Sequence, residues 1–141
     1  MKILFLDIDG VVNSKDTITR SHRGVIGIDP YMAFLVGKIQ LDTGCSVVLS
    51  SSWRHHEAGR EEVKKAVVDF IDYTGDCCSG IRGVEIYNWL KKHPEVTKYA
   101  ILDDEGDMLL WQKDNFFQTS WNTGITEDIA KAVTKHLSDS T

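Results

Sequence analysis

The chain has 141 residues, of which 42% are hydrophobic and 26% charged, and a formal net charge of −5. This length and balance predict a single globular domain over residues 1–141 and exclude a disordered or fibrous chain. The acidic balance provides no basic field for nonspecific binding to nucleic-acid backbones, although it leaves room for a local basic groove.

The N-terminal apolar run Ile3-Leu4-Phe5-Leu6 is too short for a signal peptide or a membrane span, and acids follow it directly. The cysteines Cys45, Cys77 and Cys78 form no CxxC pair, which fits reduced thiols. Arg82 leaves a reactive Cys77 open as the less favoured alternative to ordinary packing. We therefore expect a cytoplasmic protein that has no membrane partner.

The strands predicted in chain order are apolar runs that lack a polar alternation. Such runs are typical of strands that are buried on both faces of a sheet. They comprise residues 2–7, 45–50 and 98–103, with 115–119 as a shorter candidate.

Helices are predicted in the intervals between these strands. They cover residues 30–41, about 57–73, 84–92 and 127–137, with Asp29 and Thr126 as the expected N-caps of the first and last. The alternation predicts an α/β fold, a three-layer Rossmann-like sandwich around a largely parallel sheet. Residues 11–28 fit neither pattern and are predicted to form a flap, and no segment has room for a large cap domain.

Polar side chains follow the three strongest strands. They are Asp7-Ile8-Asp9-Gly10, Ser50-Ser51-Ser52-Trp53-Arg54 and Asp103-Asp104. The carboxyl ends of parallel strands meet at one edge, where open α/β sheets bind their ligands. Acids that gather there repel one another unless they are neutralised, and oxygen ligands suit a hard cation. The sequence therefore predicts a Mg²⁺ site at this edge.

The order of these motifs resembles the signature of the haloacid dehalogenase (HAD) superfamily. That signature has a strand ending in Asp-x-Asp-Gly, a strand ending in Ser or Thr, a basic residue and a strand ending in acids. The matching residues here are Leu4-Phe5-Leu6-Asp7-Ile8-Asp9-Gly10, Val48-Leu49-Ser50, Arg82 or a nearby lysine, and Ile101-Leu102-Asp103-Asp104.

The chain is more closely similar to the small HAD domains of Swiss-army-knife RNA repair proteins and their stand-alone or phage relatives. The supporting residues are Ser50-Ser51-Ser52-Trp53-Arg54, Arg82-Gly83 leading to Ile86 and Trp89-Leu90, Leu102-Asp103-Asp104, and Gly124-Ile125-Thr126. The resemblance implies a HAD-like fold, a β-hairpin flap after Asp-x-Asp-Gly, and nucleic-acid ends as substrates.

The resemblance implies that Asp7 is the nucleophile and that Asp9 is the general acid and base, where the alternative is a solvated acidic turn. It also implies that Asp104 binds Mg²⁺ directly, with a side-chain oxygen of Asp7 and the backbone carbonyl of Asp9. Asp103 either binds the ion or orients its ligands, unless it only stabilises a helix start.

The resemblance further implies that the Ser50 hydroxyl binds a phosphoryl oxygen, assisted by backbone amides of the following turn at Ser51. Arg82 is favoured as the cation that compensates the phosphate, and Lys98 is the alternative. Arg54 either contacts the substrate, braces the acidic centre or forms a surface salt bridge.

Trp53, Trp89 and Trp111 lie beside apolar segments and are expected in the core, which leaves Trp121 as the best candidate for stacking on a base. The predicted function is Mg²⁺-dependent phosphomonoester hydrolysis through an aspartyl-phosphate, on nucleotides or polynucleotide termini. A phosphatase of small metabolites or phosphoproteins, or a non-catalytic partner-binding module on the same fold, is the alternative. The sequence leaves the oligomeric state and the natural substrate open.

Overall fold

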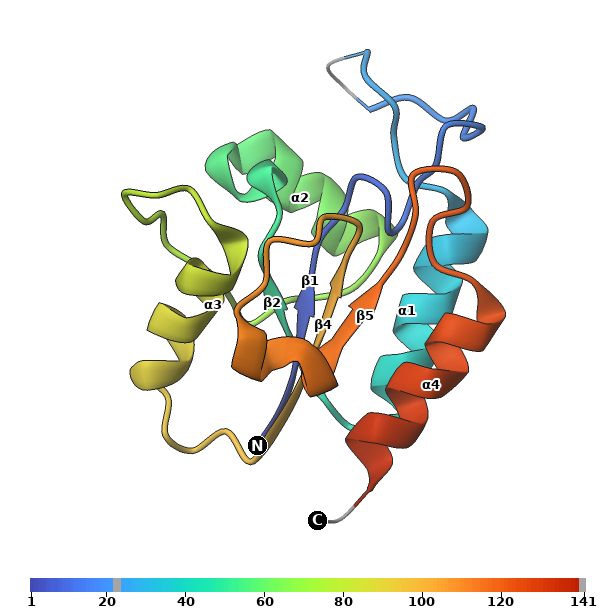
Figure 1. Cartoon of the computed structure of the whole chain (residues 1–141). Helices are drawn as coiled ribbons and strands as arrows, with labels where there is room; N and C mark the ends of the chain where they lie inside the picture. Colours follow the sequence, from blue (N-terminus) through green and yellow to red (C-terminus); the bar gives the residue numbers. More distant parts are fainter. Residues whose placement is uncertain (22–23, 140–141) are drawn as a thin grey trace.

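A computed structural model describes residues 1–21 and 24–139 and has a central five-stranded sheet (Figure 1). All neighbouring strands are parallel, and their order is β3-β2-β1-β4-β5. The strands are β1 (Lys2–Leu6), β2 (Ser46–Leu49), β3 (Asp72–Tyr73), β4 (Lys98–Asp103) and β5 (Phe116–Gln118). The predicted α/β fold with a parallel sheet is confirmed, and no large cap domain is present among the described residues.

Within the described residues, four α-helices and two short 3₁₀-helices accompany the strands, and all but the last helix connect them. They are α1 (Pro30–Thr43), η1 (Ser52–His55), α2 (Glu57–Ala66), α3 (Arg82–Lys91), η2 (Leu110–Asn115) and α4 (Glu127–Ser138). The Asp29 carboxylate accepts hydrogen bonds from the first turn of α1, and the Thr126 hydroxyl accepts one from the amide of Ile129 in α4. Both predicted N-caps are confirmed.

The two faces of the sheet bury separate hydrophobic clusters, as expected for alternating side chains on strands. Leu4 and Leu6 point to the cluster that α1, α2 and α4 cover, whereas Ile3 and Phe5 point to the cluster that Trp89 of α3 closes. Figure 1 shows α1 and α4 side by side on one side of the sheet and α3 on the other. The chain is thus a three-layer sandwich.

The predicted helix over residues 57–73 was wrong in its last third. Helix α2 ends at Ala66, and the chain then pairs with β2 through the bonds from the Ile71 amide to Val47 and from the Thr74 amide to Leu49. The β-branched Val67 and Val68 weaken the end of the helix, because their χ1 freedom is restricted there. Pairing with the open edge of β2 then decides the conformation.

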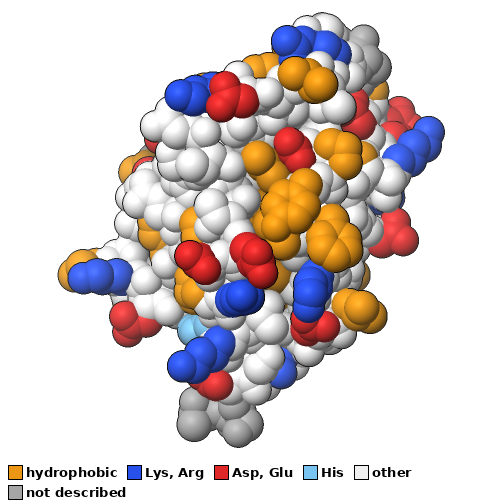
Figure 2. Space-filling model, turned by 90° about the vertical axis from the view of Figure 1, so that its right-hand side faces the viewer, with side chains coloured by type: hydrophobic (Ala, Val, Ile, Leu, Met, Phe, Trp, Pro, Cys, Tyr) orange, Lys and Arg blue, Asp and Glu red, His pale blue; other side chains and the backbone are white. Residues whose placement is uncertain are grey.

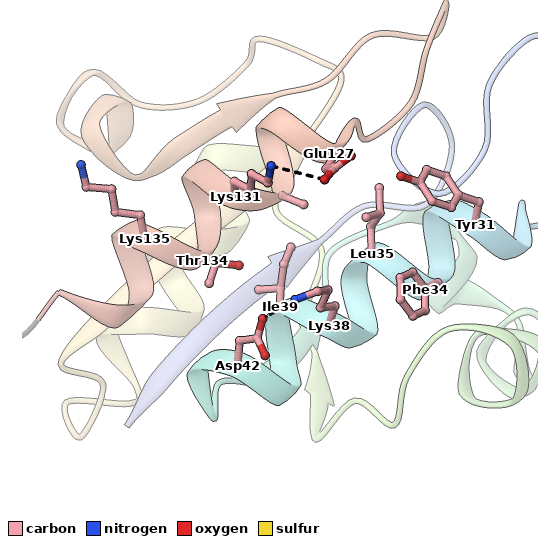
Figure 3. Close-up of a pocket in the computed structure, with 11 residues that line it drawn as sticks. Tyr31, Phe34, Leu35, Lys38, Ile39, Asp42, Glu127, Lys131, Thr134 and Lys135 are labelled. Carbon is pink, nitrogen blue, oxygen red and sulfur yellow. Dashed lines mark hydrogen bonds and ion pairs between the residues drawn. The ribbon is translucent and has the colours of Figure 1, made fainter.

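The outer side of α1 carries the exposed apolar side chains of Tyr31, Phe34 and Leu41 (Figure 2). Between α1 and α4 lies a groove of about 360 Å³, whose floor includes Leu35 and Ile39 (Figure 3). None of the acids at the strand ends lines this groove. No helix within the described part of the chain is both long and apolar enough to cross a membrane.

Candidate active site

The strand register places five polar residues in one row at the carboxyl edge of the sheet. Leu6 pairs with both Leu49 and Leu102, so the residues that follow them come side by side. Three backbone bonds continue the ladder past the strand ends, from Asp7 to Leu102, from Ser50 to Leu6 and from Thr74 to Leu49. The row consists of Thr74, Ser50, Asp7, Asp103 and Gln118.

Three carboxylates meet at the centre of this row. Oxygens of Asp7, Asp103 and Asp104 lie within 4.8 Å of one another, and Asp7 and Asp103 are buried. Burial, reinforced by the charge of Asp103, raises the pKa of Asp7 well above its usual range. Burial also raises the pKa of Asp103 to about 6, although Arg82 opposes this shift. Such a set of crowded oxygen donors fits Mg²⁺, which would relieve their repulsion.

Gly10 makes this crowding possible. Its φ of +81° lies in the left-handed region that favours glycine. A Cβ atom at this position would collide with the carboxylate of Asp104. The Asp-x-Asp-Gly turn and the end of β4 can therefore approach each other only with glycine at position 10.

The side chain of Asp9 lies outside this three-acid cluster. Its two oxygens accept hydrogen bonds from Nδ2 of Asn13 at 3.0 Å and from Nε1 of Trp53 at 3.2 Å. Asn13 also accepts a bond from the amide of Gly10, so it fixes the whole turn. Asn13 was not predicted from the sequence, where its only signal is its place four residues after Asp9.

Ser50 presents a buried hydroxyl beside the acids. Its Oγ is inaccessible to solvent, and no hydrogen-bond partner for it exists among the described residues. A buried polar atom without a partner costs free energy, which a ligand oxygen can recover. Ser51 differs, because its Oγ accepts a bond from the amide of Trp53 and so caps η1.

Arg82 is the cation that the fold brings to the acids. It is the first residue of α3, and its Nη1 lies 2.8 Å from Oδ2 of Asp103 and 3.3 Å from Oδ1 of Asp7. Its backbone amide donates to Asp107, which caps the helix. Lys98 lies at the opposite end of β4, paired with Lys2, and its Nζ donates to the backbone of Asp139.

A comparison with protein families matches residues 3–130 to the family described as HAD domain in Swiss Army Knife RNA repair proteins. The chain belongs to this family. Among curated proteins, no relative matches the chain. The match covers β2 to β5 and all of β1 except Lys2, and it therefore includes every residue of the row at the carboxyl edge.

In this HAD domain, the side chain of Arg54 is buried, and its guanidinium binds backbone carbonyls at the ends of β2 and β3. Its guanidinium donates to the carbonyls of Ser50, Ser51 and Thr74 at 2.9–3.2 Å, and it ties the ends of β2 and β3 together. Arg54 therefore stabilises the turn that follows β2.

The charge of Arg54 is balanced by two acids. Its Nη2 lies 2.7 Å from Asp76 and 3.2 Å from the buried Glu85. Glu85 also accepts a bond from the amide of Cys77 and lies 3.9 Å from Nε of Arg82. Glu85 was not predicted from the sequence, where its only local signal is an acid one helical turn after Arg82.

The tryptophans of the HAD domain differ in burial, and not all of them lie where the sequence predicts. Trp89 lies in the core as predicted, but Trp111 is 65% exposed and contacts the ring of Tyr87 in α3 in a T-shaped arrangement. Trp53 is partly buried and contacts Asp9, so it belongs to the candidate site. Trp121 lies in an exposed loop.

Proposed function

We propose that this HAD domain is a Mg²⁺-dependent phosphatase that forms an aspartyl-phosphate on Asp7 and acts on nucleotides or polynucleotide ends. The observation that supports it most is the buried hydroxyl of Ser50, which has no hydrogen-bond partner in the part of the chain that the structure describes and follows β2 next to Asp7, whose carboxylate Arg82 contacts. Together they offer a nucleophile, a phosphoryl-oxygen donor and a compensating cation at one edge of the sheet.

Mg²⁺ would be held by side-chain oxygens of Asp7 and Asp104 and by the backbone carbonyl of Asp9, with Asp103 next to them. When bound, it supplies positive charge that shields the attacking carboxylate from an anionic substrate. Asp103 has both oxygens engaged, one by Nη1 of Arg82 and one by the amide of Glu105. Its role in the proposal is therefore to hold Arg82 and to complete the acidic cluster.

In the first step, a carboxylate oxygen of Asp7 attacks phosphorus while the bond from phosphorus to the leaving oxygen breaks. Asp9 donates a proton to the leaving alkoxide, which departs as an alcohol. The hydroxyl of Ser50 and the guanidinium of Arg82 hold the phosphoryl oxygens, whose charge is greatest in the transition state.

In the second step, Asp9 accepts a proton from a water molecule, which attacks phosphorus and breaks its bond to Asp7. Inorganic phosphate leaves, and both carboxylates return to their starting states. The hydrogen bonds from Asn13 and Trp53 keep Asp9 oriented for both proton transfers. This division of labour needs two acids in different environments, and Asp7 is buried whereas Asp9 is exposed.

Two observations support nucleotide or polynucleotide ends as substrates. The family description concerns RNA repair proteins. In addition, a site without a large cap domain admits bulky substrates, whereas small metabolites usually gain from a lid that excludes water.

The decisive experiment incubates the protein with Mg²⁺ and 3′- or 5′-phosphorylated oligonucleotides, or with an aryl phosphate, and analyses rapidly quenched protein by mass spectrometry. We expect phosphate release and a phosphoryl adduct on Asp7. An adduct on Ser50 or Cys77 would overturn the mechanism. Neither turnover nor trapping of beryllium fluoride on Asp7 would instead support the partner-binding module.

A further inference from the structure

The orientation of Asp9 indicates where a leaving group must lie. Its carboxylate is bound by Nδ2 of Asn13 and by Nε1 of Trp53, so it lies next to the indole ring. In the proposed function, Asp9 gives its proton to the leaving oxygen. The rest of the leaving group then extends past Asp9 and along Trp53.

A cleft opens on that side of the site, between the 11–28 segment and the start of α2. Its volume is about 400 Å³, within the range of small-molecule sites. Val25 of the 11–28 segment lines the cleft, and Trp53, His55 and His56 line it from η1 and its C-terminal cap. The cleft therefore adjoins Asp9 through Trp53.

The indole of Trp53 is a fixed wall of this cleft. Its Nε1 is bound to Asp9, and the ring also packs against the main hydrophobic core. Gly59 allows α2 to pack closely against the backbone of Trp53, because a Cβ atom at position 59 would lie only 2.7 Å from the carbonyl oxygen of Trp53. A ring held in this way loses little conformational freedom when a ligand stacks on it.

The remaining walls suit a flat ring with polar edges. Val25 is 54% exposed and offers an apolar contact from the 11–28 segment. His55 and His56 are exposed, and an imidazole can donate or accept a hydrogen bond at the edge of such a ring. Nε2 of His55 lies 2.9 Å from Asp76, which fixes the orientation of the imidazole.

On the basis of the proposed function, we propose that this cleft is the leaving-group subsite and that it takes an alcohol bearing a flat heteroaromatic ring, such as a nucleoside. The ring stacks on Trp53 and contacts Val25, and its polar edge faces His56. Trp53, Val25 and His56 thereby determine specificity, while the acids perform the chemistry.

The test measures binding, so that it does not depend on turnover. Calorimetry with Mg²⁺ and the Asp7→Asn protein compares adenosine 3′- and 5′-monophosphate with ribose 5-phosphate, which lacks the base. We expect the tighter of the two nucleotides to bind at least about tenfold more tightly than ribose 5-phosphate, as base stacking usually provides. If the affinity for the nucleotide divided by the affinity for ribose 5-phosphate, here called the affinity ratio, is near one, the proposed subsite is wrong.

Variants in the Asp7→Asn background show where the nucleobase of the ligand binds. Trp53→Leu should bring the affinity ratio close to one, and the exposed Val25→Asp should also lower it if Trp53→Leu fails to fold. Trp111→Leu is the matched control, because this exposed tryptophan lies outside the cleft, and its ratio should stay unchanged. Loss of the ratio in Trp121→Leu but not in Trp53→Leu or Val25→Asp would contradict the assignment.

Turnover by the wild-type protein separates this inference from the proposed function. Hydrolysis of phosphomonoesters together with an affinity ratio near one would leave the phosphatase intact and refute the subsite. A high ratio that Trp53→Leu abolishes, without hydrolysis of any phosphomonoester, would support nucleoside binding in the cleft and refute the phosphatase.

Discussion

Nη1 of Arg82 donates a hydrogen bond of 2.8 Å to Oδ2 of Asp103, and this bond holds the cation of α3 at the end of β4. The Arg82 side chain keeps 19% of its surface exposed, so a substrate oxygen can still reach it. Burial disfavours the negative charge of Asp103, and the positive charge of Arg82 opposes this effect. A buried acidic cluster of this kind therefore needs positive charge nearby to stay ionised.

The first prediction concerns this cation. Arg82→Ala should lower kcat/KM on an aryl phosphate by roughly 10²- to 10³-fold, the loss typical of one transition-state donor, and leave the protein folded by circular dichroism. Lys98→Ala is the control and should change kcat/KM by less than about twofold, because Lys98 lies at the other end of β4. The reverse result would assign the phosphate to Lys98.

The second prediction separates the two carboxylates of the Asp-x-Asp-Gly turn. Asp7→Asn should form no adduct, whereas Asp9→Asn should form the aspartyl-phosphate from an activated aryl phosphate and then stall. The reason is that such a leaving group needs little protonation, but the attack of water still needs a base. Quenched-flow mass spectrometry measures the adduct, and fast turnover by Asp9→Asn would refute its role as the base.

The third prediction is a pH dependence of stability. The pKa of Asp103 is about 6 in the folded protein and about 4 in the unfolded chain, so the folded state binds the proton more tightly. The contribution of Asp103 to the free energy of unfolding therefore falls as pH rises through this window, by about 3 kcal/mol. Asp7 shifts in the same direction.

Urea unfolding in EDTA, at pH values from about 4 to 7.5, measures this effect as the difference between wild type and Asp103→Asn. The wild type should lose stability relative to the variant as pH rises, and millimolar Mg²⁺ at pH 7.5 should restore it. A difference that does not change with pH would refute the raised pKa.

The fourth prediction concerns the partnerless hydroxyls. Ser50→Ala should lower kcat/KM by about 10²-fold, yet leave the free energy of unfolding unchanged or raise it by roughly 1 kcal/mol, because it removes an unsatisfied polar atom. Thr74→Val is matched, since its hydroxyl is also buried without a partner among the described residues. It should preserve stability in the same way and reduce activity far less.

The fifth prediction tests Glu85. Glu85→Gln keeps the shape of the side chain but removes the buried anion beside Arg54, so we expect a loss of about 1–3 kcal/mol in unfolding free energy. Because Arg54 braces the carbonyls of Ser50 and Ser51, kcat/KM should also fall. Chemical denaturation and steady-state kinetics measure both effects, and a variant with wild-type values would refute the role of Glu85.

The strand ends could be predicted from the sequence because each acid directly follows an uninterrupted apolar run. The alternation of strands and helices indicates a parallel sheet whose carboxyl edge gathers the acids, and the pairing of β1 with β4 then brings Asp7 next to Asp103. The short β3 could not be predicted, since Asp72 and Tyr73 have no strand pattern of their own and pair only because β2 offers an open edge.

The network of Arg54 and Glu85 was also beyond the sequence. The two residues are 31 positions apart, and their contact depends on how α3 packs beside the end of β2. Trp53 packs against the main core as its apolar neighbours predict, but only the fold brings its Nε1 to Asp9. Local patterns therefore place the acids, and tertiary packing selects their partners.

The shared register of Ser50, Asp7 and Asp103 has an evolutionary consequence. An insertion or deletion inside β1, β2 or β4 would turn every later side chain of that strand to the opposite face and dismantle the row. Length changes at the exposed positions around Gly24 and Val25, away from Asn13 and the core residues of the 11–28 segment, leave the row untouched. Descendants of this chain can thus acquire new substrates by exchanging that loop, whereas their reaction chemistry is inherited as a single unit.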